Sequence, residues 1–154
     1  MPTYVINRTI DTQVKTEITN SLLSHNKAFE LYSRSSNLDI GIAALNFSKQ
    51  TGLRVTLIAK DGKVIAESDS NIVLNKMDNH LNRPEIIQSK LNEVGSSQRF
   101  STTLNQEMMY LAIPIVLDKY NWTVRGSMSL SSIEMIIKDL QKQVVYLGII
   151  IGFS

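Results

Sequence analysis

The chain has 154 residues, 43% of them hydrophobic and 19% charged, a composition typical of one folded domain with a full core. Its formal net charge is only +2 and its 16 basic residues are scattered, so we reject nucleic acid as a partner. The absence of cysteine excludes disulfides, thiolate metal sites and a cysteine nucleophile.

The first third of the chain predicts two helices. Residues 5–33 contain neither Gly nor Pro, and their apolar residues recur at intervals of four, which is typical of a long amphipathic helix. Such a stripe meets either a partner helix or the protein's own sheet, and the two can hold for different halves. A second helix is predicted from about residue 38 to Gly52, with Ser36 or Asn37 as its N-cap. We expect a homodimer through one stripe of the long helix: Ile10, Val14, Ile18 and Leu22.

The clearest local signal is a β-hairpin at residues 51–68. Apolar and polar residues alternate from Leu53 to Lys60 and again beyond the Asp61-Gly62 break. Asp-Gly is typical of a two-residue primed turn, which needs positive φ angles. Ile58 falls on the face opposite the main apolar set, so we expect both faces of the sheet to be covered, one of them by helices.

The rest of the chain predicts more sheet. Residues 69–82 read as a long irregular loop, and Pro84-Glu85 begins a short helix that we expect to end at Gly95. Three further strands are predicted near residues 98–104, 108–116 and 120–130, and then a final helix capped by Ser131 or Ser132. The order of elements predicts an α+β fold, a five-stranded antiparallel sheet with a long N-terminal helix and a C-terminal helix.

The end of the chain is uncharged and strongly apolar over residues 144–154, about half of what a membrane span needs. We interpret it as the start of a transmembrane segment, with a buried terminal helix or strand as the alternative. The predicted organisation is therefore a stalk helix at residues 1–36, a central folded domain at 37–130, and a C-terminal helix at 131–154 that leads into the span.

Several segments resemble the extracytoplasmic sensor region of bacterial histidine kinases of the phosphate-regulon type. They are residues 51–68, 77–85, 99–104 and 110–114, and the most specific is Asp-Asn-His-x-x-Arg-Pro-Glu at 78–85. The resemblance covers roughly residues 37–140 and implies a PAS-like fold of the single Cache type on the outer side of the cell membrane. The chain has no Gly-rich nucleotide loop and no phosphorylation helix, so it is not itself an enzyme, whereas its parent would be a protein-histidine kinase.

Residues that could carry chemistry are few. Asp78, His80 and Glu85 invite a metal or catalytic interpretation, but their irregular spacing favours a loop anchor with His80 packed or bonded to a carbonyl. We expect no metal and no cofactor. Motifs for a serine nucleophile, a zinc protease or a P-loop are missing from the sequence, so we assign no catalytic residue.

For ligand binding, the sequence offers polar side chains on strands and in the loop that could face a pocket. An arginine there could hold a carboxylate or phosphate at two points, although pairing with an acidic residue of a neighbouring strand is the simpler interpretation. The candidates are Arg99, Ser101, Tyr110, Arg125 and His80.

The sequence therefore predicts the extracytoplasmic sensor domain of a two-component histidine kinase. Its terminal helices would relay a small-molecule or protein stimulus through the membrane. Two alternatives stay open: the sensor domain of a chemoreceptor, and a soluble PAS-like module that binds a small molecule.

Overall fold

The structure is a computed structural model that describes residues 2–102, 104–132, 135, 142–143 and 145–146, with the backbone alone for residues 2–11 and 13. The chain divides into two compact units. The first contains Met1–Ser97 and Tyr110–Ser127, and the second contains Gln98–Met109 and Met128–Ser154.

Two helices open the first unit, as predicted. They are α1 (Pro2–Ser35) and α2 (Ile40–Thr51). The N-cap of α2 is Asp39 and not Ser36 or Asn37, because its carboxylate accepts the backbone N–H groups of Gly41 and Ile42. Gly52 ends α2 in the left-handed conformation with φ 71°, as the sequence indicated.

The strands form one five-stranded sheet in the order β2-β1-β5-β4-β3. Strand β1 pairs antiparallel with both β2 and β5. The number of strands and the α+β class are as predicted. The strands are β1 (Arg54–Ala59), β2 (Val64–Glu67), β3 (Gly95–Ser101), β4 (Gln106–Leu117) and β5 (Tyr120–Ser129).

The β1–β2 turn differs from the predicted two-residue primed turn. Gly62 has φ 86°, but Asp61 is not among the described residues with positive φ. The Ala59 carbonyl accepts the Gly62 N–H, the Lys63 carbonyl accepts the Ala59 N–H, and the register shifts between Leu57 and Ile58. These features match the longer hairpin loop in which glycine takes the left-handed position beside a bulge, and the Asp-Gly pair alone did not distinguish the two.

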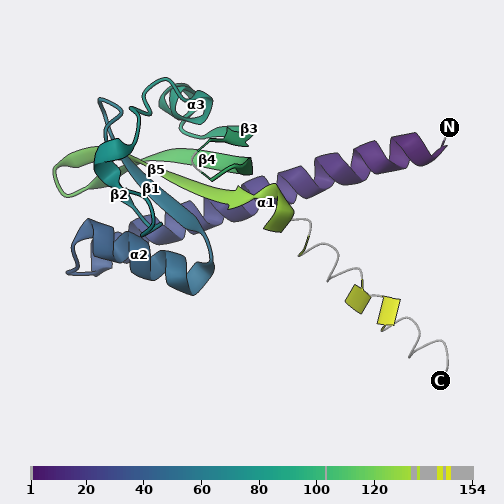
Figure 1. Ribbon diagram of the computed structural model, residues 1–154, viewed down its shortest axis with the longest axis horizontal. Helices are drawn as coiled ribbons and strands as arrows, with labels where there is room; N and C mark the ends of the chain where they lie inside the picture. Colours follow the sequence, from purple (N-terminus) through teal and green to yellow (C-terminus); the bar gives the residue numbers. More distant parts are fainter. Residues whose placement is uncertain (1, 103, 133–134, 136–141, 144, 147–154) are drawn as a thin grey trace. The chain divides into compact units, whose positions relative to one another are not determined.

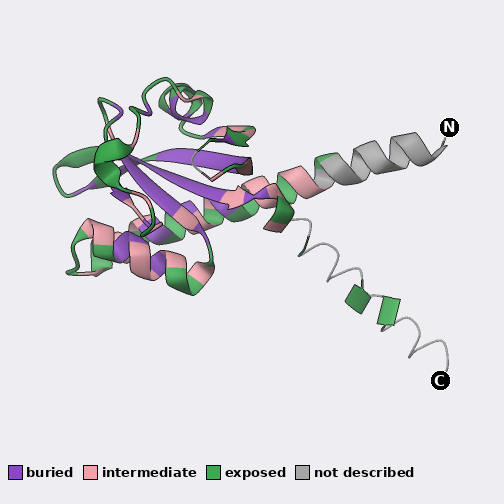
Figure 2. Cartoon of the chain, in the orientation of Figure 1, coloured by how far each residue is buried: buried purple, intermediate pink, exposed green. Residues whose placement is uncertain are grey.

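Helices cover both faces of the sheet within the first unit (Figure 1). On one face, α1 contacts β4 where the buried Asn26 amide donates to the Leu111 carbonyl at 2.9 Å. Phe29 of α1 and Phe47 of α2 meet edge to face, with ring centroids 5.3 Å apart. Figure 2 shows the resulting burial along β1, β4 and β5.

The opposite face is covered by α3 (Pro84–Asn92) and the loop before it, which contains the short helix η1 (Leu74–Lys76). Ile86 of α3 packs with Ile58 and Ala112 of the sheet, all three fully buried. Helix α3 ends before the predicted Gly95, at Asn92, and Glu93 after it takes the left-handed conformation at φ 64°. Gly95 begins β3 instead, where its lack of a side chain lets the Glu85 backbone approach closely.

The second unit contains the β3–β4 turn and the residues after β5. Ser101 Oγ accepts the Leu104 N–H at 3.3 Å, and Asn105 turns with φ 53°. After β5, Ser129 Oγ accepts the Ser132 N–H at 3.1 Å, so Ser129 replaces the predicted Ser131 or Ser132 as the cap. Most of the predicted C-terminal helix and of residues 144–154 lies outside the described residues. Where the chain is described, none of its helices has the length and apolar character that a membrane span requires.

Candidate ligand-binding site

A buried polar cluster lies between the sheet and α3, centred on Arg125 of β5. Thr56 of β1 is the direct antiparallel partner of Arg125, so both side chains project from the same face of the sheet. Glu85, in the first turn of α3, approaches the same face from the helix that covers it. Although all three residues are polar, Arg125, Thr56 and Glu85 are no more than 2% exposed.

The Arg125 guanidinium contacts three different groups. Its Nη1 donates to Glu85 Oε1 at 3.3 Å, and its Nη2 donates to Thr56 Oγ1 at 3.1 Å. Its central carbon lies 4.8 Å from the centroid of the Tyr110 ring, a cation–π distance. Ser97 Oγ donates to the other carboxylate oxygen of Glu85 at 2.6 Å. The carboxylate therefore links α3 to two strands.

A second ion pair adjoins this cluster and has a different geometry. Arg54 Nε and Nη2 each donate to one oxygen of Glu67 at 3.0 Å, the two-point arrangement that favours carboxylates. Thr56 Oγ1 donates to Glu67 at 2.9 Å while it accepts from Arg125, so its hydroxyl connects the two pairs.

Burial governs the charge states in the cluster. Loss of water lowers the pKa of Arg125 from its ordinary value to about 10, although the Glu85 carboxylate opposes the shift. Desolvation, with the nearby positive charge of Arg125, lowers the pKa of His80 from 6.5 to about 4. At neutral pH the site thus holds a charged Arg125 and an uncharged His80.

His80 anchors the loop before α3, as the loop-anchor interpretation expected. Its backbone N–H donates to the Gly62 carbonyl at 2.8 Å, and its ring Nδ1 donates to the Asp78 carbonyl at 2.7 Å. The Asn79 amide donates to the Asp61 carbonyl at 2.9 Å. A side chain at Gly62 would collide with Asn79, so the glycine permits this close approach as well as the turn.

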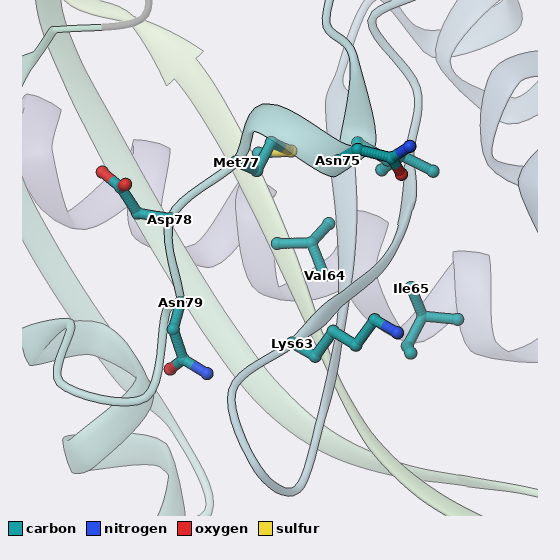
Figure 3. A pocket seen from close by; sticks show the side chains of 8 residues that line it. Lys63, Val64, Ile65, Asn75, Met77, Asp78 and Asn79 are labelled. Atoms are coloured by element: carbon teal, nitrogen blue, oxygen red, sulfur yellow. The ribbon is translucent and has the colours of Figure 1, made fainter.

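An open pocket of about 380 Å³ lies beside this loop, between β2 and residues 74–79. Figure 3 shows Val64 and Met77 facing the hollow, while the Asp78 carboxylate points away from it. The lining residues are Lys63, Val64, Ile65, Leu74, Asn75, Met77, Asp78 and Asn79. None of the predicted ligand-binding residues lines this pocket. A further hollow of about 650 Å³ lies where the α1–α2 connection meets the β4–β5 turn.

The structure brings together some of the predicted site residues. Tyr110 and Arg125 are in contact, and the charge of Arg125 acts on His80. Arg99 and Ser101 belong to the second unit, and a ligand-binding role for them stays a prediction. The pairing of Arg125 with a carboxylate was expected, but its partner lies on α3 and not on a neighbouring strand. The sequence signal for Glu85 was its place after Pro84 in a first helical turn, which does not reveal a contact 40 residues away.

The predicted dimer stripe divides between core and surface. Leu22 is 1% exposed and packs in the core of its own chain, whereas Val14 and Ile18 are half-buried. The side chain of Ile10 lies outside the described residues. Within the described part of the chain, no group of three acidic, histidine or cysteine residues could hold a metal ion.

Comparison with known proteins defines the class of fold. Neither a family model nor a curated protein matches the chain. Among solved structures, the ligand-binding domain of the Campylobacter jejuni chemoreceptor Tlp3 in complex with 4-methylisoleucine aligns with a TM-score of 0.64 at 12% identity, over 81% of this chain and 56% of that one. The sensor domain of the V. cholerae histidine kinase DctB aligns with a TM-score of 0.61 at 18% identity, over 86% and 59%.

The E. coli DcuS sensor domain aligns with a TM-score of 0.60 at 12% identity, over 82% of this chain and 98% of that one. By contrast, the chain spans less than three fifths of the Tlp3 and DctB domains. The fold is therefore that of the PAS-like, Cache-type sensor domains: a five-stranded antiparallel sheet preceded by a long helix.

Proposed function

We propose that this chain is the extracytoplasmic sensor domain of a membrane-bound sensor histidine kinase of the phosphate-regulon type, and that it responds to a small molecule. The observation that carries the proposal is its alignment with nearly the whole DcuS sensor domain, 98% of that chain. At this level of identity the likeness concerns the fold, so the resemblance of residues 78–85 supplies the particular kinase type.

The site supports a binding role over a catalytic one. Its polar groups are buried and engage one another around a charged arginine. The hydroxyls of Ser97 and Thr56 donate to carboxylates that are themselves paired with arginines. Several solved relatives bind amino acids or related compounds, as in the Tlp3 complex with L-norvaline and the PctC complex with GABA. We propose that Tyr110, Arg125 and His80 form the corresponding ligand-responsive region here, and that the domain acts as a homodimer.

The test is autophosphorylation of the full-length parent in membrane vesicles supplied with ATP. We expect an acid-labile phosphohistidine on its cytoplasmic part, together with an active alkaline phosphatase fusion placed after Ser129. A chemoreceptor would give the active fusion without phosphohistidine. An inactive phosphatase fusion would contradict the extracytoplasmic location itself.

A further inference from the structure

We propose that Glu85 is the internal occupant of an oxyanion site at Arg125, and that a small carboxylate ligand competes with Glu85 for the guanidinium. Displacement of Glu85 would release the first turn of α3 from the sheet. The signalling consequence rests on the proposed function, whereas the competition for Arg125 is a property of this domain alone.

The first argument is the incomplete pairing of Arg125. Its contact with Glu85 is a single one at 3.3 Å, longer than the 2.7–2.9 Å typical of charge-assisted hydrogen bonds. Among the described residues, its buried Nε has no hydrogen-bond partner. Arg54, by comparison, holds Glu67 through two bonds of 3.0 Å. A carboxylate free to orient itself could engage Nε and an Nη together, which Glu85 does not do.

The second argument is the chemistry of the Arg125 surroundings. Thr56 donates its hydroxyl proton to Glu67 and offers its oxygen to Arg125 Nη2, while the Tyr110 ring lies against the guanidinium. These contacts come from strands and stay in place if α3 moves. Glu85 is the one carboxylate that the described structure pairs directly with Arg125, so its departure leaves a buried cation that a ligand of the same chemistry can neutralise.

The third argument is that Glu85 belongs to a short helix that buries few apolar side chains. Helix α3 has nine residues and follows a long, mostly exposed segment. Ile86 is buried beneath α3, but Ile87 and Leu91 on its outer side are 46% and 77% exposed. Local opening is easiest where few apolar side chains are buried, so α3 can leave the sheet at a lower cost than a strand can.

The experiment uses the purified domain and the variant Glu85→Ala, which removes a group the size of an acetate ion. We expect acetate to raise the melting temperature of this variant saturably, with an affinity at least about tenfold higher than for the wild type. Succinate tests a dicarboxylate, inorganic phosphate tests the other common oxyanion, and chloride at equal ionic strength reports general salt effects. Glu107→Ala, which removes an exposed carboxylate, is the matched control and should show no such gain.

Two further variants make the result decisive. Glu85→Gln keeps the side-chain shape and is the alternative if Glu85→Ala does not fold; it should also bind acetate more tightly than the wild type. The double variant Glu85→Ala/Arg125→Gln should lose the acetate response. In the wild type, saturating acetate should increase hydrogen exchange at the α3 amides of residues 86–92.

Equal effects of acetate and chloride, or acetate binding that survives Arg125→Gln, would overturn the proposal. So would unchanged exchange of α3 in acetate-saturated wild type. A phosphate affinity above that of acetate and succinate would overturn the assignment to carboxylates. These outcomes do not depend on the kinase activity of the parent, so failure here is distinguishable from failure of the proposed function.

Discussion

At the scale of single residues, His80 couples the charge state of the site to the stability of the fold. Its pKa falls from 6.5 to about 4 in the folded protein, chiefly because the ring is buried. The unfolded chain therefore binds a proton at a higher pH than the folded chain does. The stabilising contribution is complete above about pH 6.5 and is lost as the pH falls towards 4.

The variant His80→Asn should flatten this part of the stability profile, because asparagine does not titrate. Between pH 7 and 4 we expect the wild type to lose up to about 3 kcal/mol more unfolding free energy than the variant. Urea denaturation at four pH values measures the difference. His25→Asn, at the other histidine of the chain, is the control. Parallel pH profiles for wild type and His80→Asn would show that His80 is not the titrating group.

Arg125 and its partner Glu85 illustrate how much of a buried site the sequence can predict. Alternation along residues 120–130 placed Arg125 on one face of a strand, and the direct pairing with Thr56 follows from strand geometry. The identity of its carboxylate partner depends on where α3 docks. That position is determined by buried contacts such as Ile86 with Ile58, which are long-range and leave no periodic signal. Glu85 could therefore be predicted as a helix-start residue but not as a ligand of Arg125.

At the scale of elements, the two ends of α1 have different environments. Leu22, Asn26 and Phe29 are buried at helical spacing against the sheet and α2, whereas Val14 and Ile18 are only half-buried. The four-residue spacing left open whether a partner helix or the protein's own sheet covers each half of the stripe, because periodicity identifies an apolar face without showing what covers it. Burial now separates the residues that stabilise the monomer from those available to a partner helix.

Val14→Glu and Ile18→Glu together should weaken self-association by about tenfold or more, because each would place a charge in an apolar helix seam. The melting temperature should change less than in Leu22→Glu, which places a charge in the core of the monomer. Light scattering after size exclusion measures the mass. Thr16→Glu, on the exposed side of α1, is the control. An unchanged dimer in the double variant, or a wild type that is monomeric throughout, would remove α1 as a dimer helix.

At the scale of the whole molecule, the loop before α3 connects parts of the chain that are distant in sequence. Its residues 79 and 80 are bonded to the β1–β2 turn, and Glu85 at its end is bonded to β3 and β5. The general fold could be predicted because its signals are local in the sequence. They are the helix period, the alternation along the strands, and Gly52 at the end of α2. The turn type at Asp61-Gly62 and the cap of α2 could not, since each depends on which of several suitable neighbours makes the hydrogen bond.

The role of the apolar end of the chain is a question for the whole molecule. Within the described residues, the buried hydrophobic side chains run from Leu22 to Val124, whereas Val145 and Tyr146 are 61% and 67% exposed. These two are the described members of residues 144–154. We expect the deletion of residues 144–154 to leave the melting temperature within about 2 °C of the full chain, a difference of roughly 0.5–1 kcal/mol. If this segment begins a membrane span, the full chain should float with neutral liposomes in a density gradient and the deletion variant should not. Unfolding of the deletion variant would instead assign residues 144–154 to the core and contradict the membrane interpretation. Equal flotation of both proteins would place the lipid-binding surface elsewhere in the chain.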